Sequence, residues 1–419
     1  MDASGNSYTT GYFVGAMTVG STTLTAVGYQ DIFMIKLDPS GSPVWAKGFG
    51  SSSDGANYGH SIAVDASGNS YTTGYFTGTM TVGSTALTAV GYQDIFMIKL
   101  DPSGSPVWAK GFGSSSYAIG FGIAVDASGD SYTTGYFART MTVGSTTLTA
   151  VGNGDIFMIK LDSSGSPVWA KGFGGSSDKY GQGIAVDASG NSYTTGYYTG
   201  TLTVGSTTLT AVSGQDIFMI KLDSSGSPVW AKGFGSSSSN SYAGGFGIAV
   251  DASGNSYTTG SFQGTMTVGS TSITAGNQDI FMIKLDSSGS PVWAKGFGSS
   301  TKYNSNDVGH GIAVDASGNS YTTGVFQGTM TMGSTTLTAV GGYDIFIVKL
   351  DSWGSPVWAK GFGNSGDDVG RGIAMDASGN SYASGSFEGT MTVGSTTLTA
   401  VGWADIFMIK LDPSGGPAS

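Results

Sequence analysis

The three-residue phrase DIF recurs seven times along this chain, at intervals of 61 to 65 residues. The copies begin at Asp31, Asp94, Asp155, Asp216, Asp279, Asp344 and Asp405. A representative copy reads GIAVDASGNSYTTGYF, GTMTVGSTTLTAVG and DIFMIKLDPSGSPVWAKGFG, followed by a stretch rich in Ser, Gly and Tyr. Self-similarity at a fixed period is the signature of repeat architectures. We therefore expect residues 1–419 to form one domain of seven tandem repeats, each about 61–65 residues long.

Turn chemistry divides each copy into four short strands, called A to D here. In the second copy we predict them at Ile62–Val64, Ser70–Phe76, Ile95–Leu100 and Val107–Phe112. The turns between A and B (DASGN) and between C and D (DPSGSP) carry an Asp that can cap backbone amides and a Gly that tolerates positive φ. The segment TMTVGSTALTAV between B and C predicts an extra hairpin, with its turn near Gly83-Ser84.

The apolar pattern of strand C favours blades that are covered on both faces. Its sequence IFMIKL is apolar on both sides, whereas a strand with one wet face alternates. Aromatic residues make up 12% of the chain and charged residues 11%, and no helical periodicity is present. The blades of a propeller are packed between their neighbours. We predict an all-β, seven-bladed β-propeller of four-stranded antiparallel blades, each with the extra B–C hairpin.

The strand count predicts an incomplete seam. Strands B and C occur seven times, but strand A and strand D occur only six times each, so the first blade lacks A and the last lacks D. Unpaired strand edges can pair with another chain. The prediction leaves three outcomes open: a ring that closes with gaps at its seam, further repeats outside this sequence, or self-association through the unpaired edges.

The phrases GIAVDASGNSYTTG and DIFMIKLDPSGSPVWAKGFG resemble the bacterial SBBP repeat, a seven-bladed β-propeller repeat. The resemblance covers essentially the whole chain and is specific for fold rather than chemistry. It implies an extracellular or cell-surface bacterial protein, although no signal peptide is visible in the sequence. No apolar run approaches the roughly 18 residues that span a membrane. The net charge of −11 and the lack of a basic stripe argue against nucleic-acid binding.

Differences between the repeats concentrate in the D–A and B–C connections, which propeller topology places on one rim. Loops on a rigid scaffold carry function. One position at the start of strand A holds His60, Phe121, Gln182, Phe246, His310 and Arg371. These residues are a candidate ligand-contacting collar; the alternative is sequence drift at a permissive exposed position. The two histidines lie four repeats apart, so a shared metal site is not expected.

Aromatic residues of the same rim are the second candidate. The D–A stretches contain Tyr58, Tyr117, Tyr180, Tyr242 and Tyr303, and Tyr29, Tyr92, Tyr343 and Trp403 precede strand C. Flat rings with nearby Asp and Asn suit sugars; the alternative is packing of glycine-rich loops.

Residues that are repeated in every blade are expected to be structural. Asp65, Asp94 and Asp101 typify three rings of acids, and each suits the capping of loop or turn amides. Lys36 and Lys47 are expected to snorkel to a blade edge or to pair with Asp. No cofactor, metal site or catalytic motif is predicted, and the absence of cysteine removes thiol chemistry.

Three functions are compatible with the predicted propeller and its variable rim residues. The first is a non-enzymatic extracellular or cell-surface scaffold for adhesion or structure, with protein or surface glycan as partner. The second is a carbohydrate-binding propeller that uses the rim aromatics. The third, a polysaccharide hydrolase or lyase, requires two unique acids to converge in a rim pocket. The candidate acids are Asp178, Asp307, Asp367, Asp368 and Glu388.

Overall fold

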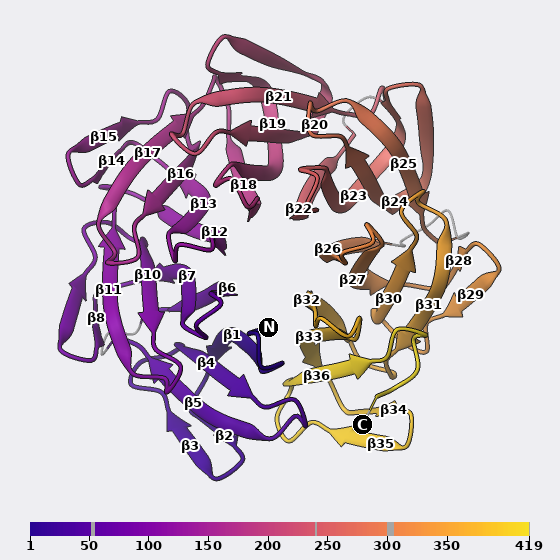
Figure 1. Cartoon of the computed structure of the whole chain (residues 1–419), viewed down its shortest axis with the longest axis horizontal. Coiled ribbons are helices and arrows are strands. Elements are labelled where there is room, and N and C mark those ends of the chain that lie inside the picture. The colour runs from indigo at the N-terminus through magenta and orange to yellow at the C-terminus, as the bar shows by residue number, and fades with distance from the viewer. Residues whose placement is uncertain (52–54, 239–240, 300–305, 419) are drawn as a thin grey trace. The chain divides into compact units, whose positions relative to one another are not determined.

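The computed structural model describes residues 1–51, 55–238, 241–299 and 306–418, and every regular element in these ranges is a β-strand (Figure 1). The predicted fold class is confirmed: the chain is all-β and consists of the blades of a seven-bladed β-propeller, built from antiparallel sheets. The described ranges contain no helix long and apolar enough to cross a membrane.

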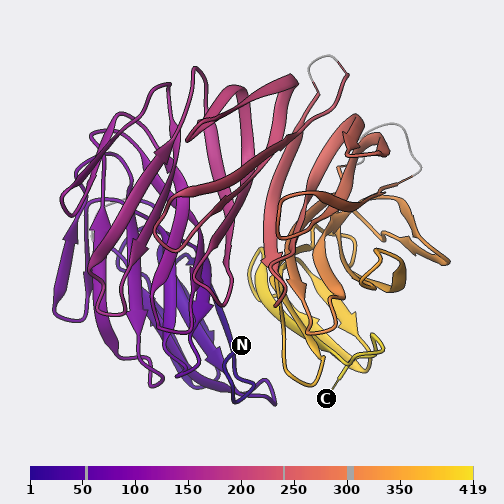
Figure 2. The same ribbon diagram turned by 45° about the horizontal axis from the view of Figure 1, so that its top comes forward.

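Each blade is a separate sheet whose strands lie side by side, as Figure 2 shows from a second direction. The first two blades contain β1 (Ser7–Phe13), β4 (Asp31–Leu37) and β5 (Pro43–Phe49), then β6 (Tyr58–Val64), β7 (Ser70–Phe76), β10 (Asp94–Leu100) and β11 (Pro106–Phe112). The third and fourth contain β12 (Ala118–Val125), β13 (Ser131–Phe137), β16 (Asp155–Leu161) and β17 (Pro167–Phe173), then β18 (Lys179–Val186), β19 (Ser192–Val204), β20 (Thr207–Leu222) and β21 (Pro228–Phe234). The fifth contains β22 (Ala243–Val250), β23 (Ser256–Val268), β24 (Thr271–Leu285) and β25 (Pro291–Phe297). The last two contain β26 (Val308–Val314), β27 (Ser320–Phe326), β30 (Asp344–Leu350) and β31 (Pro356–Phe362), then β32 (Val369–Met375), β33 (Ser381–Phe387) and β36 (Asp405–Leu411).

The chain divides into two compact units, and the boundary between them runs through the fourth sheet. The first unit comprises Met1–Thr194, Tyr198–Thr210 and Ile220–Val229; the second comprises Thr195–Tyr197, Ala211–Met219 and Trp230–Ser419. The two units are therefore described separately below. Organisation of all seven repeats as a single domain stays a prediction.

The first strand of a complete blade starts earlier than predicted. Strand β6 begins at Tyr58 rather than at Ile62, and its register pairs Tyr58 with Tyr75 and Gly59 with Gly74. The sequence predicts a loop for the glycine-containing residues before Ile62, because glycine is depleted in strands. Here glycine is required by close approach, since a Cβ on Gly74 would lie 1.8 Å from the Tyr58 carbonyl oxygen. Tyr58 is thus a strand residue, and so is Tyr180 in β18.

The repeated aspartates cap turns and loops, as predicted. Asp65 accepts hydrogen bonds from the backbone amides of Ser67 and Asn69, at 3.0 and 2.9 Å. Asp101 accepts from the amide and hydroxyl of Ser103. Asp94 accepts from two amides of the loop before it, and burial raises the pKa of its carboxyl. These acids therefore stabilise the scaffold in every copy.

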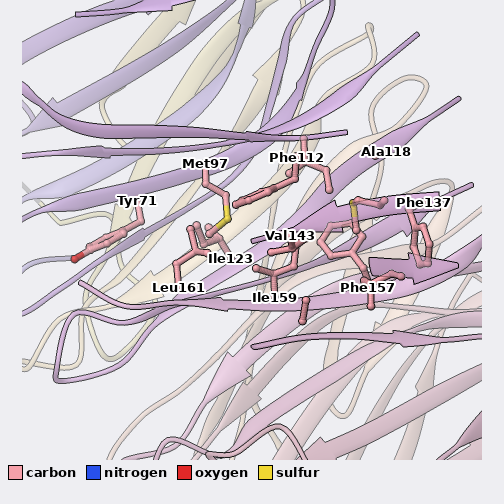
Figure 3. Packing of buried hydrophobic residues seen from close by; sticks show 14 of the residues in the cluster. Tyr71, Met97, Phe112, Ala118, Ile123, Phe137, Val143, Phe157, Ile159 and Leu161 are labelled. Carbon is pink, nitrogen blue, oxygen red and sulfur yellow. The ribbon is translucent and has the colours of Figure 1, made fainter. Parts of the chain in front are cut away.

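The hydrophobic core lies between consecutive blades. Figure 3 shows one cluster in which Tyr71, Met97 and Phe112 of the second blade pack against Phe137 and Phe157 of the third. A strand that is buried on both faces follows from this arrangement, because each sheet is covered by the preceding and the following blade.

Polar side chains bridge the same blade-to-blade contact. The Trp108 indole donates to the Ser163 carbonyl of the next blade at 3.2 Å, and the Lys99 ammonium donates to the same oxygen at 3.1 Å. Lys99 also lies 4.9 Å from the centre of the Tyr71 ring. The predicted pairing with Asp is confirmed at Lys36, whose ammonium lies 3.6 Å from the Asp2 carboxylate. The contacts of these lysines with the neighbouring turn and with an aromatic ring were not indicated by the sequence pattern.

The extra hairpin is confirmed. In the second blade it consists of β8 (Thr79–Val82) and β9 (Thr85–Thr88), with Gly83 at φ 59° in the turn. The corresponding strands are β2 (Ala16–Val19), β3 (Thr22–Thr25), β14 (Thr140–Val143), β15 (Thr146–Thr149), β28 (Thr329–Met332), β29 (Thr335–Thr338), β34 (Thr390–Val393) and β35 (Thr396–Thr399). In the fourth and fifth blades the hairpin is continuous with β19, β20, β23 and β24.

Both terminal blades are incomplete, as the strand count predicts. Within the described ranges the first and last sheets have three strands each, in the orders β1-β4-β5 and β32-β33-β36. A single bridge between Leu411 and Pro417 begins the missing fourth strand of the last blade. Ile406 in the last blade is 38% exposed, whereas its counterpart Ile95, which packs against the third blade, is fully buried.

Candidate functional site

The variable position near the start of each first strand is the extra residue of a β-bulge. The strand register skips His60, Phe121, Phe246, His310 and Arg371. A glycine precedes each of them, and a glycine or Ser61 follows. Bulges re-aim a side chain while the strand continues. The predicted collar residues are therefore strand residues, and Gln182 holds the same place in β18.

Neighbouring first strands lie against each other within each unit, as β6, β12 and β18 do in the first and β22, β26 and β32 in the second (Figure 1). The glycine after the bulge allows this approach: a Cβ on Gly122 would lie 2.9 Å from the Gln182 carbonyl oxygen. Each histidine also reaches the next blade, since His60 Nδ1 lies 3.1 Å from the Gly120 oxygen. The structure thus brings neighbouring collar residues together inside each unit.

In the first unit these residues join a continuous row of aromatic rings. The His60 ring stacks on Phe121, with centroids 5.0 Å apart, and meets the Tyr75 ring edge-on at 5.6 Å. Tyr58 stacks on Tyr75 at 5.1 Å. The row continues at both ends through the pairs Tyr12–Tyr58 at 4.2 Å, Phe121–Tyr180 at 6.4 Å and Tyr136–Tyr180 at 4.6 Å. We call these seven residues the aromatic row; its rings are half-buried or exposed.

Three members of the aromatic row were missed by the sequence reasoning. Tyr12, Tyr75 and Tyr136 occupy the residue before the last of the second strand in the first three blades. The signal was present in the sequence, because the seven copies read SYTTGYF, SYTTGYF, SYTTGYF, SYTTGYY, SYTTGSF, SYTTGVF and SYASGSF. This position is Tyr in the first four repeats and Ser or Val in the last three.

The other predicted aromatics do not form one platform. Tyr117 precedes β12, outside the strand position of Tyr58 and Tyr180, and stacks on Tyr92 at 5.4 Å. Tyr242 likewise precedes β22, and burial raises the pKa of its hydroxyl. Trp403 is 87% exposed. Tyr303 lies outside the described residues.

In the second unit a pocket of about 320 Å³ occupies the corresponding place between β26 and β32. Its lining residues are Gln278, Asn306, Val308, His310, Val325, Tyr343, Val369 and Arg371. His310 Nδ1 lies 2.8 Å from the Gly370 carbonyl oxygen, so this nitrogen carries the hydrogen. Burial, with the charge of Arg371 as a smaller cause, lowers the pKa of His310 to about 4. The imidazole is therefore neutral at physiological pH.

A fully buried position lies three residues before each bulge residue, and its chemistry changes from blade to blade. Its occupants are Asn57, Ala118, Lys179, Ala243, Asp307 and Asp368. Asp307 accepts from the amides of Ser299 and Gln327, at 2.6 and 2.9 Å. Burial raises the pKa of Asp307 to about 6. The Lys179 ammonium donates to the Ser177 carbonyl, and burial lowers its pKa.

The candidate catalytic acids are thereby located. Asp307 and Asp368 are buried caps of loop amides and do not line the pocket of the second unit. Asp367 accepts from the Tyr343 amide at 3.1 Å. Burial raises the pKa of Asp368, and the charges of Glu388 and Asp367 are smaller causes. In the described part of the chain, no group of three His, Cys, Asp or Glu residues is arranged to hold a metal ion.

The comparisons with known proteins agree with the fold. Residues 168–200 match the family model described as "SBBP: Beta-propeller repeat", which confirms the resemblance drawn from the sequence. A WD repeat-containing protein of Acanthamoeba polyphaga mimivirus is 25% identical over 85% of this chain. The chain spans only 31% of the length of that protein.

Three solved structures illustrate the fold at low identity. A gluconolactonase from Xanthomonas campestris is 11% identical, with a TM-score of 0.34, over 75% of this chain and 86% of its own. A calcium-binding regucalcin from Agrobacterium tumefaciens is also 11% identical, with a TM-score of 0.34, over 78% and 81% of the two chains. A Synechocystis apocarotenoid oxygenase mutant is 10% identical, with a TM-score of 0.43, over 98% and 87%.

One sequence-based prediction is corrected by these matches. The prediction that the chain is not an enzyme is wrong as an exclusion, because the similar propellers include a gluconolactonase and an apocarotenoid oxygenase. That prediction follows from the lack of a catalytic motif in the sequence, whereas the pocket of the second unit brings Arg371, His310 and two side-chain amides together. The likenesses themselves assign no activity to this chain.

Proposed function

We propose that this protein binds carbohydrate through the aromatic row of its first unit. The observation that carries the proposal is the continuity of the row, in which seven rings from four neighbouring blades touch one another while staying accessible. Aromatic faces combine a large apolar area with few rotatable bonds. They match the apolar C–H faces of sugar rings, which repeat along a glycan as the rings repeat along the row.

Polar groups beside the row can pair with sugar hydroxyls. Burial raises the pKa of the Tyr136 hydroxyl to about 12, and Tyr180 and Asp178 are smaller causes, so this hydroxyl keeps its proton and can donate to a ligand. Asp178 lies two residues before Tyr180 and is half-buried. Gln30 and Gln93 reach the hydroxyls of Tyr58 and Tyr75. Binding sites of this kind combine an apolar surface with a few fixed polar groups.

A pair of substitutions borrowed from the sixth blade tests the proposal. Val308 and Val325 face each other there at the register positions of Tyr58 and Tyr75, so Tyr58→Val with Tyr75→Val reproduces an existing pair. On an array of neutral plant and microbial oligosaccharides, we expect the double variant to bind about tenfold more weakly or worse, since aromatic contacts contribute about 0.5–1.5 kcal/mol each.

The matched control removes an aromatic side chain elsewhere. Trp353 is 79% exposed in a turn where the other copies have Ser, and Trp353→Ser should leave glycan binding unchanged. If the unaltered protein binds no glycan on the array, or if the double variant binds as the unaltered protein does, the proposal is wrong. A scaffold for adhesion through protein partners, and a location outside the cell or at its surface, stay predictions.

A further inference from the structure

The pocket of the second unit exists because the rings of the first unit are absent there. Val325 and Val308 stand at the register positions of Tyr75 and Tyr58. Val369 and Ser386, which face each other in the last blade, continue this change to smaller side chains. The volume vacated by the rings leaves a hollow of about 320 Å³, with three valines among its lining residues. That volume is at the lower end of the range for small-molecule sites, about 300–1,000 Å³.

Among the described residues that line the pocket, one is charged. It is Arg371, one of the two arginines, Arg139 and Arg371, in a chain whose net charge is −11. An exposed guanidinium presents a planar fork of donors that matches a carboxylate. Arg371 therefore gives the pocket a group that can pair with an anionic ligand.

His310 can accept a hydrogen bond from a ligand, whereas the Arg371 guanidinium can only donate. Because His310 Nδ1 donates to the Gly370 carbonyl, Nε2 of the neutral ring bears a lone pair and can accept from a hydroxyl. Gln278 and Asn306 add side-chain amides to the lining, and Asn306 donates to the Tyr343 hydroxyl at 3.3 Å. A complementary ligand carries a carboxylate for Arg371, hydroxyls for the other groups, and an apolar face for the valines.

We propose that this pocket binds a sugar acid, with the carboxylate of a hexuronic acid on Arg371, a ring hydroxyl donating to His310 Nε2 and the C–H face of the sugar against Val308, Val325 and Val369. A monosaccharide matches the size of the hollow. This site is separate from the aromatic row, and the proposal does not depend on glycan binding there.

The test compares D-galacturonate with D-galactose by titration calorimetry on the full chain. We expect galacturonate to bind and galactose to bind at least about tenfold more weakly, because a charge-assisted hydrogen bond is lost. Two variants copy residues that other blades already hold at the bulge: Arg371→Gln follows Gln182, and His310→Phe follows Phe246. Each should weaken galacturonate binding about tenfold to a hundredfold.

The matched control is the other arginine. Arg139 stands in the first unit where most copies have Gly, so Arg139→Gly should leave galacturonate binding unchanged. Equal affinity for galactose and galacturonate, or equal losses in the Arg139 and Arg371 variants, would overturn the proposal. Loss of glycan binding in the Tyr58/Tyr75 double variant, with galacturonate affinity retained, keeps the two sites distinct; loss of both affinities together would contradict a separate site.

Discussion

At the scale of single residues, the buried position three residues before each bulge accepts neutral, basic and acidic side chains in otherwise similar blades. Asn57 there uses both amide atoms: Nδ2 donates to the Gln30 carbonyl at 2.9 Å, and Oδ1 accepts from the Thr77 amide at 3.2 Å. Asp307 accepts from two amides but faces no cation among the contacts that shift its pKa. Two backbone amides therefore pair with a buried carboxylate at this position, although burial disfavours the charged form of that carboxylate.

This contrast predicts a pH-dependent stability. The pKa of Asp307 in the folded protein is about 6, above the ordinary aspartate value, so the folded state binds this proton more tightly than the unfolded chain does. The contribution of Asp307 to stability is then largest below about pH 4 and falls as pH rises to about 6, by about 3 kcal/mol at most. Relative to the unaltered protein, Asp307→Asn should gain stability over this interval in urea unfolding.

The control for this prediction has the opposite sign. Hydrogen bonds from the Ser40 side chain and the Ser42 amide lower the pKa of exposed Asp38. Its carboxylate therefore stabilises the fold above the ordinary aspartate pKa, and Asp38→Asn should lose stability relative to the unaltered protein as pH rises. Parallel pH profiles for the unaltered protein and Asp307→Asn would contradict the assignment.

At the scale of elements, the extra hairpin is part of the contact between blades. Met80 of β8 is fully buried, and it forms a bridge with Ser51, the residue that follows the first blade by two positions. Its cluster includes Trp45 and Phe49 of that blade. A hairpin that looks like a surface insertion in the sequence therefore covers the outer strand of the preceding blade.

Replacing this methionine by Ala should lower the free energy of unfolding most where the hairpin packs against the outer strand of a preceding blade. Met80→Ala leaves a cavity in the cluster, and we expect a loss of about 2–5 kcal/mol in the free energy of unfolding. Met17 holds the same hairpin position in the first blade but is only partly buried, so Met17→Ala should cost clearly less. Urea denaturation of the two variants measures the difference, and equal losses would mean that the hairpin does not contribute through blade contact.

At the scale of the whole molecule, the terminal blades are the weakest point of an otherwise repeated structure. Among the described residues, the outer edge of β36 forms the Leu411–Pro417 bridge and a hydrogen bond from the Ala418 amide to the Lys410 carbonyl. In the complete second blade the equivalent strand pairs along its length with β11, where Phe112 faces Ile95. On one face of β36 Ile406 is partly exposed, whereas Phe407, Ile409 and Leu411 on the other face are buried.

Completion of the last blade should therefore stabilise the chain. The residues after Pro417 would be replaced by Val-Trp-Ala-Lys-Gly-Phe-Gly, the sequence that follows Pro356 in the sixth blade. We expect a higher melting temperature, by about 2–4 °C for each kcal/mol gained from burial and pairing. A tail of equal length with Ser in place of Trp and Phe is the control. Equal melting temperatures for the two tails would show that the edge is already satisfied, and light scattering would reveal whether it pairs with a second chain.

The repeat, the four-stranded blade, the turn-capping aspartates and the three-stranded terminal sheets could all be predicted from the amino-acid sequence. These features follow from local chemistry: turn residues fix their own backbone, and a strand that is apolar on both faces requires cover on both sides. The change from Tyr to Ser or Val at the sixth residue of SYTTGYF is also present in the sequence, although its importance is clear only from the structure.

Which residues of different blades contact one another could not be predicted from the sequence and became known from the folded chain. Glycine pairs such as Gly59 with Gly74 belong to a strand because backbone from neighbouring strands comes close, and no local propensity records that approach. The sequence around His60 and His310 predicts a loop, but each residue is the bulge of a strand. Through the bulge each histidine contacts a glycine of the next blade, about 60 positions away in the sequence. Contacts over that distance in sequence depend on how blades stack, so the aromatic row and the pocket became visible only in the folded chain.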